Sequence, residues 1–330
     1  MWTVKAVVLR SPGDLVVTDV ETPRPGPGEV LVRVTNSGIC GTDLKIFTGG
    51  MPASYPVIMG HEISGEVSGA RVVVDPVLSC STCAECEAGR TNLCAAGGVI
   101  GREVNGGFAE YVIAPRSHVY TLPSSIDSET APLIQVLTTC VHAQRRAGIS
   151  AGQSVAVVGL GVSGQLHAQL AKARGAALVI GITRSAWKRS LAERLGTDAT
   201  ASGGDAGVRA VCSATNGRGA DVVIETTGHV QSLAHAIAMV RPGGTIALFG
   251  IYTAGEGALP FYQLYYKEPT IVAARAATSD DFPESIDLVA SGRVKLSALV
   301  TQVLPLSQLR EALSMLEGDA DGRMKIILQH

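Results

Sequence analysis

A glycine-rich turn between a strand and a helix places the strongest constraint on how this chain folds. Residues 155–158 are all apolar, and Gly159-Leu160-Gly161-Val162-Ser163-Gly164 follows them directly. An Ala- and Leu-rich stretch that suits a helix then continues to Arg174. The G-x-G-x-x-G spacing alone also fits an ordinary glycine-rich turn. A strand before it and a helix after it favour a dinucleotide-binding Rossmann fold.

Each glycine of this turn has its own role in the expected site. Gly159 permits the tight turn, Gly161 lets the backbone approach a pyrophosphate, and Gly164 lets the helix pack close to the strand. With Val162, which opens the helix, these residues are predicted to bind the dinucleotide. Further strand-like and helical segments alternate along the chain, which predicts a doubly wound parallel sheet. They lie at 178–182, 186–195, 221–225, 231–239 and 245–249.

The residues after the second of these strands bear on the choice of nicotinamide cofactor. An NAD-binding fold of this type carries an Asp or Glu about 20 residues beyond the turn, where it binds the ribose 2′-hydroxyl. Here residues 178–182 run into Thr183 and Arg184, and Lys188 follows. A guanidinium can pair with a 2′-phosphate, so the pattern favours NADP over NAD. The alternative for Arg184 and Lys188 is the solvated start of a helix.

Four of the seven cysteines are gathered in one short segment. Cys80, Cys83, Cys86 and Cys94 have the spacing C-x2-C-x2-C-x7-C, which suits a closed, four-thiolate structural zinc site. A bacterial ferredoxin motif also begins C-x2-C-x2-C, but it closes after three residues with Cys-Pro. A disulfide framework requires an oxidising compartment and usually a small chain. Structural zinc is therefore favoured over an iron–sulfur cluster and over disulfides.

A second group of metal-binding residue types lies upstream. Cys40 and, about twenty residues later, His61 and Glu62 offer a thiolate, an imidazole and a carboxylate, the donors of an open, catalytic zinc site. Each has an ordinary alternative when it is taken singly: a small core residue, a buried polar group and a surface acid. Their occurrence with the four cysteines and the dinucleotide turn favours the metal site.

Length and composition set broader limits. A chain of 330 residues is long for one core and predicts two domains. With a net charge of −2, the chain lacks the excess of basic residues that is typical of nucleic-acid-binding proteins and of polybasic membrane-binding segments. The N-terminus lacks the features of a signal peptide, and no run of about 18 apolar residues occurs. We expect a soluble, cytoplasmic protein without a nucleic-acid or membrane partner.

Together these motifs resemble those of the zinc-dependent medium-chain dehydrogenases/reductases, the family of alcohol, polyol and threonine dehydrogenases. The similarity covers nearly the whole chain. It includes G-I-C-G-T-D at Gly38–Asp43, G-H-E at Gly60–Glu62 and G-G-F-A-E-Y at Gly106–Tyr111. Residues 141–148 and 281–294 resemble the sorbitol dehydrogenases in particular.

The resemblance implies a fold, a cofactor set and an assembly. The fold is α/β, with a GroES-like β-rich catalytic domain at residues 1–136 and 270–330 and a Rossmann domain at residues 137–269. The expected cofactors are two zinc ions per chain and NADP in preference to NAD. A homodimer or homotetramer is the expected assembly.

The resemblance also assigns roles around the catalytic zinc. Cys40 and His61 would be ligands, and Glu62 would be a direct or exchanging ligand. Thr42 would relay the substrate proton, and Asp43 would orient the His61 imidazole.

Some positions depart from the family pattern. Gln135 stands where relatives carry a further Cys or Glu ligand, and it either ligates zinc or holds a water. Lys45 replaces a His that ends the proton relay in many relatives. The connection between Val67 and Val72 is short, so we expect a shortened link between two strands. Cys140 and His142 are interpreted as packing groups, and the remaining histidines and Cys212 have no partner pattern.

The implied reaction is reversible oxidation of a secondary alcohol to a ketone by hydride transfer to NAD(P). The resemblance to the sorbitol dehydrogenases and the polar residues near the metal imply a polyol, sugar or cyclitol as the substrate class. Aromatic residues make up only 4% of the chain, which argues against an aromatic-walled pocket for a large apolar alcohol. The alternative is a non-enzymatic NADP-binding redox sensor or a structural zinc protein on the same fold.

Overall fold

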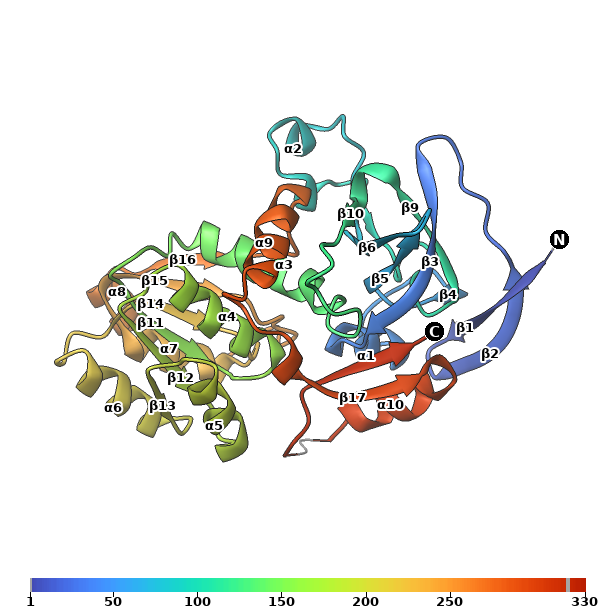
Figure 1. The fold of residues 1–330 in the computed structure, drawn as a ribbon. Helices are drawn as coiled ribbons and strands as arrows, with labels where there is room; N and C mark the ends of the chain where they lie inside the picture. The colour runs from blue at the N-terminus through green and yellow to red at the C-terminus, as the bar shows by residue number, and fades with distance from the viewer. Residues whose placement is uncertain (1, 319–320) are drawn as a thin grey trace. The chain divides into compact units, whose positions relative to one another are not determined.

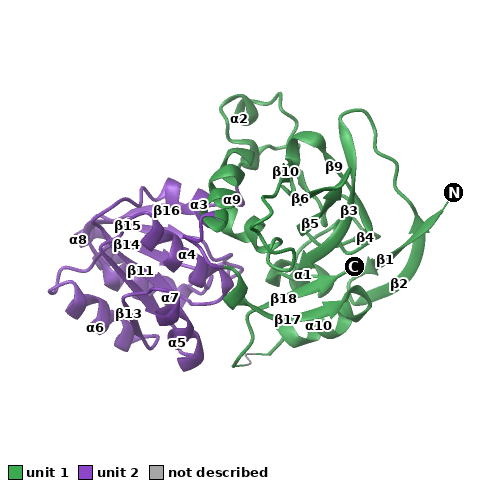
Figure 2. Ribbon diagram, viewed as in Figure 1, with its two compact units in different colours: residues 1–138, 278–290, 296–330 green, residues 139–277, 291–295 purple. Residues whose placement is uncertain are grey.

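The computed structural model describes residues 2–318 and 321–330. The chain forms two compact units (Figure 2), of which unit 1 comprises Met1–Thr138, Thr278–Ala290 and Leu296–His330. Unit 2 comprises Thr139–Ala277 and Ser291–Lys295. The chain thus returns to unit 1 after residue 277, later than the predicted 269. The reason is that residues 270–273 still form a strand of the parallel sheet in unit 2.

Unit 1 is built mostly from antiparallel strands (Figure 1). Its larger sheet has the order β10-β6-β5-β3-β18-β17, with β9 also paired to β3, and two small sheets have the orders β2-β1-β4 and β7-β8. The strands are β1 (Thr3–Ser11), β2 (Asp14–Glu21), β3 (Glu29–Gly38), β4 (Val57–Ile58), β5 (Glu62–Val67), β6 (Ala70–Val74), β7 (Val77–Leu78), β8 (Gly98–Val99), β9 (Tyr111–Pro115), β10 (Val119–Thr121), β17 (Val300–Pro305) and β18 (Lys325–Gln329).

Alternation of apolar and polar residues explains this sheet. In β3, Val30, Val32 and Val34 are buried in one apolar cluster, while the residues between them point away from it. Such period-two burial is what an antiparallel sheet with one covered face requires. The expected short link is present, because β5 and β6 are joined by Ser68 and Gly69 alone, both at positive φ.

Helices complete unit 1 and lead into unit 2. The helix α3 (Leu133–Arg146) runs across the division between the units. The others in unit 1 are α1 (Gly41–Phe47), α2 (Ala84–Glu87), α9 (Phe282–Ala290) and α10 (Leu309–Leu316), with short 3₁₀ turns at Thr91–Leu93, Arg116–His118, Ser279–Asp281, Ser297–Leu299 and Leu306–Gln308. None of the helices in the described residues combines the length and the apolar character needed to cross a bilayer.

Unit 2 contains a six-stranded parallel sheet of order β13-β12-β11-β14-β15-β16. Its strands are β11 (Ser154–Val158), β12 (Leu178–Ile182), β13 (Ala199–Ala201), β14 (Ala220–Glu225), β15 (Val240–Leu248) and β16 (Thr270–Ala273). Its helices are α4 (Val162–Ala173), α5 (Ala186–Arg194), α6 (Asp205–Ala214), α7 (Val230–Met239) and α8 (Phe261–Lys267). The predicted doubly wound sheet is therefore confirmed.

The buried strands of this sheet are covered on both faces. Val155 and Val157 pack in the cluster that contains residues of α4 and α5, and Ala156 and Val158 pack in the cluster that contains residues of α6 and α7. This arrangement explains why β11 is wholly apolar rather than alternating. From β11 the chain runs outward to β12 and β13 on one side and then crosses to β14 on the other side, so the strand order reverses between β11 and β14. In such sheets, ligands bind in the crevice at the carboxyl ends of the strands at this point.

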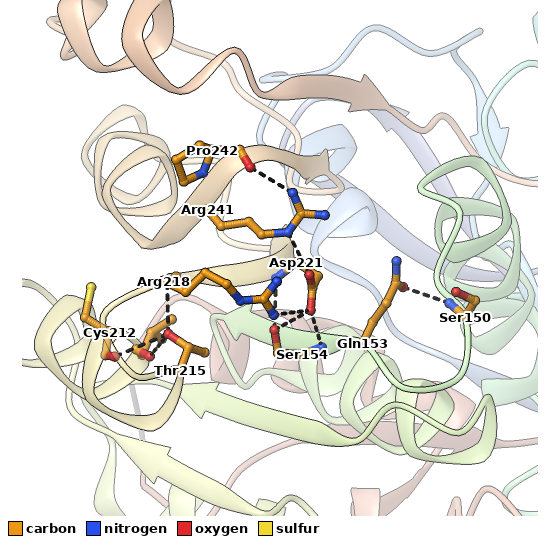
Figure 3. Close-up of polar contacts among 11 residues, drawn as sticks. Ser150, Gln153, Ser154, Cys212, Thr215, Arg218, Asp221, Arg241 and Pro242 are labelled. Carbon is orange, nitrogen blue, oxygen red and sulfur yellow. Dashed lines mark hydrogen bonds and ion pairs between the residues drawn. The ribbon is translucent and has the colours of Figure 1, made fainter.

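A buried carboxylate closes the amino end of the sheet (Figure 3). Asp221 Oδ2 accepts hydrogen bonds from Ser154 N at 2.8 Å, Ser154 Oγ at 2.7 Å and Arg218 Nη2 at 3.1 Å. Its Oδ1 accepts one from Arg241 Nε at 2.7 Å. One side chain thereby joins β11, β14 and β15. Burial alone would raise the pKa of Asp221, but these donors outweigh it and hold the pKa well below its usual range.

Replacing Asp221 with Asn should destabilise the protein by about 2 kcal/mol at pH 7, because two guanidinium groups lose an anionic acceptor. The folded-state pKa lies below the unfolded value of about 3.9, so the contribution is present above that pH and is lost as the pH falls toward the folded pKa. The difference in free energy of unfolding between wild type and D221N should therefore shrink below about pH 4. Chemical unfolding at several pH values measures it. A difference that stays constant down to pH 3 would contradict this account.

Candidate metal centres and cofactor site

Three predicted ligands come together in unit 1. Cys40 precedes α1, and Glu62 opens β5 with His61 just before it. One ligand atom of each lies within 4.8 Å of the others. Glu62 is fully buried and His61 is nearly so. Strand pairing produces this meeting, since Gly38 at the end of β3 is the register partner of Glu62.

Asp43 contacts both Cys40 and His61. Its carboxylate is fully buried, with Oδ2 accepting the Cys40 N–H at 2.8 Å and Oδ1 lying 3.3 Å from His61 Nδ1. Burial lowers the pKa of His61, but Asp43 and Cys40 together raise it above its usual value. The contact agrees with the expected orienting role, because metal-bound histidines generally pair their second nitrogen with a carboxylate or carbonyl.

Lys325 is a member of the site that sequence reasoning missed. Its Nζ lies 2.7 Å from each oxygen of Glu62 and 3.0 Å from the Ile39 carbonyl oxygen, and its side chain is 4% exposed. Burial would lower the pKa of Lys325, but Glu62, Cys40 and Asp43 raise it. A lysine inside the apolar run Met324–Leu328 was the available signal, because a buried ammonium needs an anionic partner.

The approach of Glu62 depends on a glycine. A Cβ on Gly38 would overlap the Glu62 carboxylate, so only glycine fits opposite Glu62.

Thr42 lies half-buried in the first turn of α1, and Gln135 lies in the first turn of α3 with 8% exposure. Their roles as proton relay and further ligand stay predictions.

The four-cysteine segment forms a small lobe on β7, β8 and α2. The Sγ atoms of Cys83 and Cys86 are 3.5 Å apart, those of Cys80 and Cys94 are 3.5 Å apart, and those of Cys83 and Cys94 are 3.8 Å apart. Tetrahedral Zn–S bonds of about 2.3 Å separate the sulfurs by about 3.8 Å. The lobe therefore fits one ion better than an iron–sulfur cluster, whose several irons would hold the thiolates farther apart. Hydrogen bonds from Thr82 lower the pKa of Cys80 to about 6, which favours the thiolate.

The glycine turn has the geometry expected for a dinucleotide. Gly159 has a φ of +92°, and a Cβ on it would lie 2.5 Å from Thr226 Oγ1. A Cβ on Gly164 would overlap the Gly159 carbonyl oxygen, whereas a Cβ on Gly161 would meet nothing within 4 Å. The open space at Gly161, the residue before α4, leaves room for a pyrophosphate at the helix N-terminus.

The basic turn after β12 is held by an arginine that was not predicted as a site residue. Arg189 Nη1 donates to the carbonyl oxygens of Thr183 at 2.7 Å and Arg184 at 2.9 Å. Ser185 caps α5 and accepts from the Lys188 N–H at 3.3 Å. The Arg184 side chain is exposed beside this ordered turn, and its role in binding a 2′-phosphate stays a prediction.

Several unassigned polar residues prove to be structural. Cys140 and His142 are buried in α3, as expected for packing groups. His167 packs edge-on against Phe249, and burial lowers the pKa of His167 to about 3, so it is neutral. His118 does have a partner, since its Nδ1 lies 3.3 Å from the Asp75 carbonyl oxygen.

Comparison with known proteins assigns the family. Residues 26–124 match the Alcohol dehydrogenase GroES-like domain, and residues 163–291 match the Zinc-binding dehydrogenase family. L-galactonate-5-dehydrogenase of Escherichia coli (strain K12) is 35% identical over 94% of each chain, and sorbitol dehydrogenase of Halalkalibacterium halodurans is 30% identical over 90% of each. A crystal structure of a zinc-binding dehydrogenase from Sinorhizobium meliloti 1021 bound to NADP superposes with a TM-score of 0.93 at 33% identity, over all of both chains. The chain therefore belongs to the zinc-type medium-chain alcohol dehydrogenases.

Proposed function

We propose that this protein is a zinc- and NADP-dependent dehydrogenase that interconverts a secondary alcohol and its ketone. The buried set of Cys40, His61 and Glu62, ordered by Asp43 and Lys325, is the observation that carries the proposal. The relatives' names, for a sugar acid and a polyol, support a polyol, sugar or cyclitol as the substrate. The alcohol gives up a hydride from carbon and a proton from its hydroxyl.

The chain's own residues hold and order the reacting groups. Cys40 and His61 would hold a zinc ion, which would supply a Lewis acid, and the bound nicotinamide would supply the hydride acceptor. Asp43 fixes the imidazole, and Lys325 balances the Glu62 charge so that the buried site is not strongly anionic. Thr42, next to Asp43 in α1, carries the hydroxyl proton outward.

A screen of secondary alcohols and polyols with both NADP and NAD tests this function. We expect alcohol-dependent absorbance in the reduced-nicotinamide band for at least one polyol or sugar. Cofactor binding without turnover of any of these substrates would favour a redox sensor or a structural zinc protein instead.

The preference for NADP rests on Arg184. Replacing Arg184 with Ala should lower kcat/KM for NADP by about 10- to 100-fold, because a charged hydrogen bond to the 2′-phosphate is lost. The value for NAD, which lacks that phosphate, should change far less. Arg194→Ala, an exposed change at the far end of α5, is the matched control. A clear NAD preference of the wild-type enzyme would refute the assignment.

We also propose that the protein is a homodimer or homotetramer assembled through α8 and β16. Phe261, Tyr262, Tyr265 and Tyr266 in α8 are between 68% and 80% exposed. β16 stands at one edge of the sheet formed by the described residues, and Ile271 in it is exposed. A second copy can cover this aromatic surface and pair with the strand edge, since antiparallel pairing about a twofold axis is self-complementary.

Light scattering should therefore give the mass of two or four chains. Tyr265→Asp should shift the protein toward the monomer, because it places a charge in the proposed contact. Val17→Asp, at an exposed apolar position of β2, is the control. A wild-type mass of one chain would rule out this assembly.

A further inference from the structure

A second buried carboxylate lies on β14, at the opposite end from Asp221. Glu225 is fully buried. Its Oε1 accepts from Thr227 N at 2.7 Å and from the Thr227 hydroxyl, and its Oε2 accepts from Gly228 N at 3.0 Å and the Tyr252 hydroxyl at 2.6 Å. All four donors are neutral. A buried charge is costly unless it is satisfied, so this carboxylate requires these donors to stay where they are.

Glu225 holds two loops at the carboxyl end of the sheet. Its side chain binds Thr227 and Gly228 after β14 and Tyr252 after β15. Its carbonyl oxygen accepts from Phe249 N and Gly250 N, both at 2.9 Å. The loops also touch directly. A Cβ on Gly228 would lie 2.5 Å from the Ile251 carbonyl oxygen.

The first of these loops, residues 226–228, packs against the glycine turn. Thr226 N donates to the Val158 carbonyl oxygen at 3.0 Å, and Thr226 Oγ1 donates to the Gly159 carbonyl oxygen at 3.0 Å. The Thr227 methyl group also lies against Gly159, where a Cβ would come within 2.7 Å of it. Because β11 and β14 are neighbours at the point where the strand order reverses, residues 226–228 border the crevice where a dinucleotide binds in folds of this type.

We propose that Glu225 is a positioning residue for the nicotinamide cofactor. Its carboxylate fixes Thr227 and Gly228 against the glycine turn before the cofactor arrives. Without this carboxylate, the donors of Thr227 and Gly228 would bind water, and residues 226–228 would sample other conformations. The cofactor would then bind only the fraction of molecules in which this loop has the binding conformation, which raises the apparent Kd. The proposal rests on the family's use of NAD(P) and not on the preference for NADP.

The alternative is a purely structural role like that of Asp221, which satisfies donors at the other end of the same strand. The two roles differ in what a substitution changes. A structural carboxylate affects the melting temperature alone, whereas a positioning carboxylate also affects the dissociation constant of the cofactor in folded protein.

Titration of zinc-loaded protein with NADPH and with NADH, followed by nicotinamide fluorescence, tests the proposal without any substrate. Glu225→Gln should raise the Kd of the preferred cofactor by roughly tenfold, since an amide cannot accept from both sets of donors. Asp221→Asn removes the matching carboxylate at the other end of β14. It should lower the melting temperature about as much as E225Q does, but it should leave the Kd of the preferred cofactor within about twofold of wild type. An unchanged Kd in E225Q would overturn the proposal.

A second pair of variants decides the question even where E225Q does not fold. Thr227 is exposed, and a change of its side chain removes at most one of the four donors to Glu225, so these variants should still fold. Thr227→Val keeps the shape but removes the hydroxyl donor, and it should raise the Kd by about threefold to tenfold. Thr227→Ser keeps the donor and should stay within about twofold of wild type. Equal Kd values for T227V and T227S would overturn the proposal, as would a wild-type protein that binds neither cofactor.

Discussion

Replacing Cys40 with Ser should reduce kcat/KM for alcohol oxidation by at least about a thousandfold, since the lost Lewis acid is worth several kcal/mol. A serine hydroxyl is not ionised at neutral pH, so one anionic ligand is lost beside His61 and Glu62. The fold should survive, because Cys40 is the N-cap residue of α1 and Ser is a favoured residue at that position. The glycine turn is in unit 2, so the Kd for NADPH should stay within about threefold.

Metal analysis and kinetics together measure this result. Zinc content should fall from about two to about one per chain, while the melting temperature changes little. Cys212→Ser in α6, at a half-buried position with no assigned role, is the matched control and should keep both zinc ions and full turnover. Near-wild-type activity in C40S would refute the catalytic role of the metal.

Replacing Cys94 with Ser should destabilise the protein by on the order of 5 kcal/mol, a large share of what a structural zinc site contributes to folding. Cys94 is the buried member of the four-cysteine lobe, and its Sγ also accepts the Cys80 N–H at 3.3 Å. The change removes a metal ligand and leaves that N–H with a weaker partner. Zinc content should again fall by about one per chain.

Thermal unfolding with and without a chelator distinguishes the two cysteine variants. C94S should lose stability but keep most of its turnover at low temperature, because Cys40 and His61 lie just before α1 and β5 rather than in the lobe. C40S should show the opposite pattern. An unchanged melting temperature and zinc content in C94S would mean that the lobe does not hold a structural ion.

Much of the fold follows from short-range patterns. The alternation in β3 predicts a sheet with one covered face, and the wholly apolar run at 155–158 predicts a strand covered on both faces. The geometry of the glycine turn also follows from local sequence, because the tight turn and the close helix leave no room for a Cβ at Gly159 and Gly164. The lobe is equally local, since all four cysteines lie within one loop.

Contacts between distant segments were beyond such reasoning. Lys325 and Glu62 are 263 positions apart, and nothing near either residue indicates the other. In the sequence, Arg189 has the pattern of a surface charge. Only the structure shows that it donates hydrogen bonds to the carbonyl oxygens of Thr183 and Arg184. Asp221 and Glu225 both lie at strand ends, and each also needs a donor from a distant segment, Ser154 for Asp221 and Tyr252 for Glu225, that the flanking residues do not reveal.

The sequence by itself thus determined the two-domain α/β architecture, the dinucleotide turn and which cysteines, histidine and carboxylate are available for zinc. These features depend on residues close together in the chain, where backbone geometry and spacing limit the outcome. Only the tertiary structure decided what surrounds them: the ammonium that neutralises Glu62, the carboxylate that holds the loop beside the glycine turn, and the late return of the chain after residue 277. Those depend on strand order and register, which are set by the packing of the whole unit.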